Sequence, residues 1–131
     1  MNKKYLSKII AIDDEGLRVI SAYCSGAKVN INDIKYLRTN KVFLLSLNRS
    51  KVESSEKDKK VTSICKFEFV DSVKSKNIKQ NDPDQKLELI GMDYLKNNNN
   101  YEINLMFTNN AYITLSTEII EVTLDDQNKV D

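Results

Sequence analysis

The hydrophobic pattern near the N-terminus begins as a short apolar run and then takes the period of a helix. Residues 8–12 form the run, and Asp13 follows it as a residue whose carboxylate can cap a helix. Three apolar residues then recur at intervals of three and four: Leu17, Ile20 and Cys24. The pattern predicts a strand over 8–12 and a helix over 14–25 that stops at Gly26. Inside that helix Gly16 costs about 1 kcal/mol relative to alanine.

From residue 28 onward the apolar period shortens to two, which is the period of strands. Val29 and Ile31 alternate with polar residues, but the alternation then slips by one to Ile34 and Tyr36. We expect a bulge or kink at residues 32–33 to absorb this slip.

Residues 37–41 have the composition of a hairpin turn, because Asn40 tolerates the left-handed conformation that tight turns require. The strand that follows is apolar on both faces, with Phe43, Leu45 and Leu47 on one face and Val42 and Leu44 on the other. A strand that is apolar on both faces is expected to be central in its sheet.

The segment 50–60 holds mainly small and charged residues, which predicts a solvated, flexible loop. The apolar segment 61–73 is long for one flat strand, so we expect it to bend. Its apolar residues divide into two sets, with Phe67, Phe69 and Val73 on one face and Ile64 and Val70 on the other.

The C-terminal half adds one more bulge and one more hairpin. The apolar parity changes between Leu89 and Met92, and Gly91 at the switch predicts a bulge. A three-residue loop at 109–111, with an asparagine at positive φ, pairs Phe107 with Ile113 and keeps both apolar faces on one core. Residues 118–126 fit either a strand or a short helix.

These runs predict the class of fold. A chain of 131 residues fits a single domain with one core. We predict an α+β fold in which one N-terminal helix packs across a bent antiparallel sheet of six or seven strands. A half-open barrel similar to pleckstrin-homology-like folds is the favoured form, and such folds carry many different functions.

The composition excludes several classes of chemistry. The chain has no histidine, so it cannot form Ser/His/Asp or Cys/His catalytic arrangements or the usual histidine-rich metal sites. Cys24 and Cys65 form no C-x-x-C pair, and we expect buried thiols in a reducing cytoplasm. Three glycines are too few for a phosphate-binding loop. From these absences together we expect neither a cofactor nor a metal.

Charge and hydropathy narrow the range of partners. A net charge of +1 does not favour strong binding to nucleic acid. No run approaches the roughly 18 apolar residues of a membrane-spanning helix. The apolar run at 9–12 ends at Asp13 and is too short for an export signal, so we expect a cytoplasmic protein.

Several segments in order resemble a family of alphaproteobacterial proteins catalogued as domain of unknown function 2948. They are AIDDEGLRVISA (11–22), DIKYL (33–37), LNR (47–49), FEFVDSVKSKNI (67–78), NDPDQKLELIGM (81–92) and TEIIEVTLDD (117–126). The resemblance covers nearly the whole chain. It implies a small cytoplasmic bacterial protein, and it implies no particular activity.

Two acidic groups have ordinary structural interpretations. Asp82 and Asp84 flank Pro83, which suits a turn whose backbone the first aspartate hydrogen-bonds. The alternative, a cation site, needs more oxygen ligands than two carboxylates. The acidic C-terminal end, Glu118, Glu121, Asp125 and Asp126, is predicted to be solvated charge rather than an acid/base pair.

The candidate ligand-binding residues are Asn48, Arg49, Lys74 and Lys76. Lys74 and Lys76 share a face of an extended segment, and together with Arg49 they have the charge to bind a phosphate or carboxylate. The alternative is that alternate lysines are the wet face of a strand and protect a sheet edge from aggregation.

The sequence favours a non-catalytic cytoplasmic binding or adaptor module, with an unknown protein or a small anionic ligand as its partner. One alternative is a small enzyme that uses carboxylates and lysines without histidine. Another is a weak nucleic-acid-binding protein. No catalytic residue is assigned, and the oligomeric state stays open.

Overall fold

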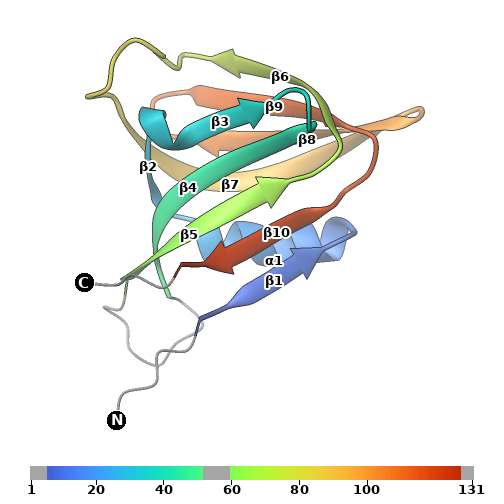
Figure 1. Ribbon diagram of the computed structural model, residues 1–131, viewed down its shortest axis with the longest axis horizontal. Coiled ribbons are helices and arrows are strands. Elements are labelled where there is room, and N and C mark those ends of the chain that lie inside the picture. The colour runs from blue at the N-terminus through green and yellow to red at the C-terminus, as the bar shows by residue number, and fades with distance from the viewer. Residues whose placement is uncertain (1–5, 52–59, 128–131) are drawn as a thin grey trace.

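The computed structural model describes residues 6–51 and 60–127, which form one curled sheet with a helix against it (Figure 1). The elements in chain order are β1 (Lys8–Ala11), α1 (Asp14–Cys24), β2 (Lys28–Asn30), the 3-10 turn η1 (Ile31–Asp33), β3 (Ile34–Leu37), β4 (Val42–Ser50), β5 (Lys60–Phe67), β6 (Val70–Lys76), β7 (Lys86–Asn97), β8 (Asn100–Phe107), β9 (Ala111–Thr117) and β10 (Val122–Asp126).

The sheet is antiparallel in every pairing between its strands. Its strand order is β1-β10-β5-β4-β2-β7-β8-β9-β6, and β3 pairs with β4 beside β2. The sheet curls but stays open. This confirms the prediction of a bent antiparallel sheet with one helix against it. The predicted count of six or seven strands is wrong, because the described residues form ten.

Local breaks in two predicted strands account for part of the higher count. The slip after residue 31 is taken up by η1, which separates β2 from β3. Phe69 has a positive φ of 58° and divides the predicted 61–73 strand into β5 and β6. The break also turns Phe69 outward, so its predicted place on the face of Phe67 is wrong, while the predicted bend is confirmed.

The helix α1 forms as its capping pattern predicts. The Asp13 carboxylate accepts a hydrogen bond of 2.8 Å from the Gly16 N–H, and Gly26 adopts a φ of 84° just beyond the last turn. The helix buries three residues against the sheet: Leu17, Ile20 and Cys24.

Within the described ranges no helix has both the length and the apolar content needed to cross a membrane.

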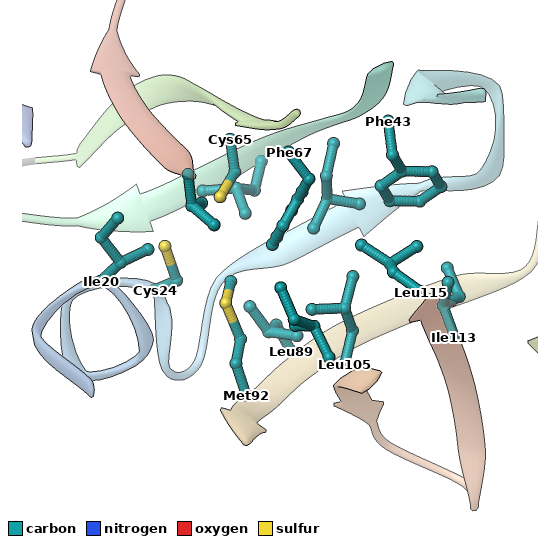
Figure 2. Close-up of a cluster of buried hydrophobic side chains, with 14 of the residues drawn as sticks. Ile20, Cys24, Phe43, Cys65, Phe67, Leu89, Met92, Leu105, Ile113 and Leu115 are labelled. Atoms are coloured by element: carbon teal, nitrogen blue, oxygen red, sulfur yellow. The ribbon is translucent and has the colours of Figure 1, made fainter. Parts of the chain in front are cut away.

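The buried side chains form one cluster between the helix and the curled sheet (Figure 2). Ile20 and Cys24 lie at the helix end of this cluster, whereas Phe43 and Ile113 lie at the far end (Figure 2). Cys24 and Cys65 are both buried free thiols, as the sequence indicates. Burial and the neighbouring Cys24 thiol raise the pKa of Cys65 well above its ordinary value.

The hairpins follow the predicted parity with two corrections. The last hairpin has three loop residues, 108–110, and pairs Phe107 with Ala111, so the predicted partner Ile113 is wrong by two positions. Asn109 and Asn110 both have positive φ, as predicted for an asparagine. In the turn before β4 it is Lys41, and not Asn40, that adopts positive φ.

The structure describes all of segment 118–126 and part of segment 50–60. Residues 118–126 are not helical, because β10 occupies Val122–Asp126 and pairs with both β1 and β5. The predicted flexible loop at 50–60 begins with the last residue of β4 and ends with the first residue of β5. Its central part, 52–59, lies outside the described residues.

Gly16 marks a close approach between α1 and β1. A Cβ atom at this position would lie 2.9 Å from both the Cα and the Cβ of Ala11, closer than non-bonded carbon atoms pack. We therefore expect Gly16→Ala to lower the free energy of unfolding, by up to about 2 kcal/mol, because the steric cost exceeds the gain in helix propensity. Urea unfolding of the two proteins measures the difference.

Gly91→Ala is the matched control. A Cβ at Gly91 meets only ordinary contacts, the nearest being the Ser21 Oγ at 3.5 Å, so this variant should be neutral or slightly more stable. A Gly16→Ala protein that is more stable than the parent would contradict the close-approach interpretation.

Candidate functional site

A hollow among the described residues lies between β3 and β6, two strands that are distant in sequence. In the described sheet β6 pairs only with β9, and β3 pairs only with β4. A cavity of about 640 Å³ opens between their unpaired edges, and residues of both strands line it. We call this cavity the β3–β6 groove. Its volume is in the range of known ligand sites.

The floor of the β3–β6 groove is apolar. Its apolar lining residues include Ile34, Tyr36, Phe43, Val73, Ile78 and Ile113. Phe43 and Ile113 belong to the buried core, at the end of the cluster that is far from the helix (Figure 2). The groove therefore has two core residues, Phe43 and Ile113, in its lining.

Two hydrogen bonds to the backbone of Val70 close one end of the groove. The Val70 N–H donates to the Lys41 carbonyl at 2.8 Å, and the Tyr36 hydroxyl donates to the Val70 carbonyl at 2.8 Å. These bonds hold the start of β6 against the β3–β4 hairpin. Beyond them β3 and β6 are not paired with each other.

The segment 77–85 follows β6 at the other end of the groove, and Ile78 and Gln80 from it contribute to the lining. The Gln85 side chain holds the segment together, because it accepts from the Lys79 N–H at 2.7 Å and donates to the Asn77 carbonyl at 3.1 Å. The predicted turn lies in this segment and is confirmed by the Asp82 carboxylate, which accepts from the Asp84 N–H at 3.0 Å.

The charges that line the groove are positive. Lys35 and Arg38 are lining residues, and no carboxylate is among the described residues that line it. A third cation, Lys41, lies at the Val70 end of the groove. It is already paired with Asp71 at 3.0 Å and with Glu118 at 3.4 Å. The Lys41 ammonium donates hydrogen bonds to Asp71 and Glu118, and these bonds together with the two negative charges raise the pKa of Lys41. The groove therefore offers cations and apolar surface together.

The structure brings together only Lys74 and Lys76 of the four predicted binding residues. Lys74 and Lys76 are exposed on β6, at the edge of the sheet, which also agrees with the edge-protecting interpretation. Asn48 is exposed on β4 and accepts from the Thr62 hydroxyl, but Arg49 points to the opposite face and is buried. The predicted surface does not form as a unit, and ligand binding by these residues stays a prediction.

Arg49 is part of a buried ionic cluster that joins β4, β5 and β10. Its guanidinium contacts the Asp126 carboxylate at 2.9 Å and donates to the Ser63 hydroxyl at 3.0 Å. The Ser63 hydroxyl in turn donates to Asp126 at 2.6 Å. Lys51 approaches the same carboxylate at 3.5 Å. The guanidinium also lies over the Tyr23 ring, 5.5 Å from its centre.

The cluster ties the N-terminal segment to the sheet. The Ser7 N–H donates to the Asp126 carboxylate at 2.8 Å, and the Asp126 N–H donates to the Ser7 carbonyl at 3.0 Å. Burial alone would raise the pKa of Asp126, but the bonds from Ser63, Ser7 and Arg49 outweigh it and hold the pKa below its ordinary value of 3.8. The carboxylate is therefore charged at neutral pH.

Sequence reasoning missed this cluster and predicted Asp126 to be solvated, which is wrong. The signal was present in the strand parity, because each residue is in phase with buried apolar neighbours. Arg49 continues the face of Leu45 and Leu47, and Asp126 continues the face of Val122 and Leu124. A polar residue at an inward position predicts a buried partner.

A metal site is not assigned. Among the residues that the structure describes, no group of three or more Cys, Asp or Glu side chains is placed to hold a metal ion. Of the acidic residues near β10, Asp126 belongs to the buried cluster and Glu118 is paired with Lys41 at the surface.

Comparison with known proteins gives one match. The model of a family described as "Protein of unknown function (DUF2948)" matches residues 7–131. The chain belongs to the DUF2948 family. No curated protein and no solved structure matches it. The resemblance seen in the sequence is thus confirmed, and membership of DUF2948 brings no activity with it.

The buried carboxylate of this DUF2948 protein gives a test of the ionic cluster. Asp126→Asn keeps the shape of the side chain but removes the negative charge that faces the buried Arg49 and Lys51. We expect the free energy of unfolding to fall by about 3 to 5 kcal/mol. Asp125→Asn, on the opposite face of β10, is the matched control and should change stability little. Equal urea midpoints for the two variants would contradict the role given to Asp126.

The lowered pKa of Asp126 predicts the pH dependence of stability. In the unfolded chain its carboxyl binds a proton near its ordinary pKa of 3.8, whereas in the folded protein it does so only at lower pH. The stabilisation is therefore fully present above about pH 5 and is lost as pH falls through the folded pKa. Ser63→Ala should raise the Asp126 pKa measured by NMR titration. A carboxyl that titrates above its ordinary value in the parent would contradict this account.

Proposed function

We propose that this DUF2948 protein is a non-catalytic binding module that receives an extended segment of a partner polypeptide in the β3–β6 groove. The observation that carries the proposal is the pair of strand edges, unpaired within the described sheet, that face one another across a cavity of about 640 Å³ with apolar and cationic lining residues. An extended segment placed there would pair with both edges and extend the sheet.

The unpaired backbone groups of a strand edge give the proposal its physical support. Unpaired N–H and C=O groups on an edge strand are a template for another extended chain. Main-chain hydrogen bonds give such a complex its affinity, and the pockets that take alternate side chains give it specificity. In the groove the side chains of Tyr36, Phe43 and Val73 line the inner face and provide apolar contact for every second residue of the incoming segment.

The proposal also includes the location of the protein and its type of fold. We place the protein in the bacterial cytoplasm and regard its sheet as a distant form of the pleckstrin-homology-like barrel. The curled antiparallel sheet with one helix against it supports the second statement. An unknown protein stays the expected partner.

The two alternatives make different demands. An enzyme that uses carboxylates and lysines needs convergent groups of both kinds in one pocket, whereas the described lining of the groove has Lys35 and Arg38 without a carboxylate. A nucleic-acid-binding protein would be retained on nucleic acid with an affinity that falls steeply with salt. At the groove, the lining therefore favours the binding module over the enzyme, and the salt dependence of retention separates the binding module from a nucleic-acid-binding protein.

The test uses random peptides displayed on phage and selected against the full chain. Ser75 lines the groove, so Ser75→Trp fills the groove with an indole ring. We expect this variant to weaken the selected peptides about tenfold or more. We also expect the peptides to slow amide hydrogen exchange on β3 and β6 of the parent protein.

Ser72→Trp is the matched control, because Ser72 is exposed on the same strand and does not line the groove. It should bind the selected peptides as the parent does. A selection that yields no peptide, or peptides that bind Ser75→Trp with undiminished affinity, would contradict the proposal.

A further inference from the structure

Resting on the proposed function, we infer that the partner segment alternates apolar and acidic residues, with the acidic side chains on the outer face of the sheet. The inference follows from the side chains that flank the groove on its two faces. A strand inserted between β3 and β6 shares their pleat, so its alternate residues face the core and the outer surface.

The register of β6 assigns its side chains to the two faces. Directly opposite residues of an antiparallel pair lie on the same face. Val73 and Ser75 lie opposite the buried residues Leu115 and Ile113, so they face inward, toward the groove. Lys74 and Lys76 alternate with them and therefore lie on the outer face, where both are exposed.

The register of β3 gives the same division. Ile34 and Tyr36 lie opposite Leu45 and Phe43, which are buried, so they face inward. Lys35 lies between them in sequence and is exposed on the outer face. The outer face thus has Lys35 on one side of the gap and Lys74 and Lys76 on the other.

An inserted strand would have these lysines as its cross-strand neighbours on the outer face. Opposite charges in such positions stabilise a sheet and like charges destabilise it. The described lining of the groove adds Arg38 and no carboxylate. The nearby acid Asp71 is paired with Lys41. Charge complementarity therefore favours glutamate or aspartate at the outward positions of the partner.

The probes are three synthetic peptides that alternate valine with glutamate, with serine or with lysine. We expect the valine–glutamate peptide to bind about tenfold or more tighter than the valine–lysine peptide, with the serine peptide between them. The preference should weaken as salt is raised, because the lysines are exposed. Isothermal titration measures the affinities, and amide exchange on β3 and β6 reports the site.

Reversal of the outer charges tests the residues themselves. Lys74→Glu combined with Lys76→Glu should abolish or invert the preference. The control is Lys28→Glu combined with Lys96→Glu, which changes the net charge equally on β2 and β7 and should leave the preference intact. Lys96 is a close match for Lys76, since each lies over a tyrosine ring, at 5.8 Å and 6.0 Å.

The outcomes separate the inference from the proposed function. Peptides that slow exchange on β3 and β6 without a charge preference, or with a preference for lysine, would overturn the acidic pattern and leave the groove as a binding site. Peptides of all three kinds that leave β3 and β6 unprotected would overturn both.

Discussion

The two hydrogen bonds to Val70 are the constraint on which the candidate site depends. They join the start of β6 to the β3–β4 hairpin through the Lys41 carbonyl and the Tyr36 hydroxyl. The positive φ of Phe69 turns the chain into this contact directly after β5. Because the two strands are held together at one end and unpaired beyond it, the sheet forms a groove instead of a closed barrel.

A second constraint stabilises the opposite end of β4. Phe43 lines the groove near the start of this strand, and Arg49 reaches the buried Asp126 near its end. A buried ion pair adds little net stability over apolar packing, but the loss of one partner is costly. The cluster joins β4, β5 and β10, and none of its charged residues is among the described lining of the groove.

Much of the fold could be predicted from local patterns. The capped helix, the bulge at Gly91 and the inward face of Phe43, Leu45 and Leu47 all depend on residues that are close in sequence. The strand count could not be fully predicted, because β5 and β6 are divided at Phe69, which adopts a positive φ that its own propensity disfavours.

The groove itself could not be predicted either, because β3 and β6 are more than thirty residues apart and no strand pattern says which edges stay unpaired. The alternation of residues 73–76 predicts Lys74 and Lys76 on one face of a strand, as the structure has them, whereas Arg49 does not lie with them. Parity assigns Arg49 to the core and the lysines to the outer face.

The most direct measurement of the central claim is an NMR structure of the chain with a bound valine–glutamate peptide. The account predicts cross-strand contacts between backbone protons of one peptide and those of both β3 and β6. Contacts to a single strand, or to another part of the molecule such as the edge of β1, would contradict it.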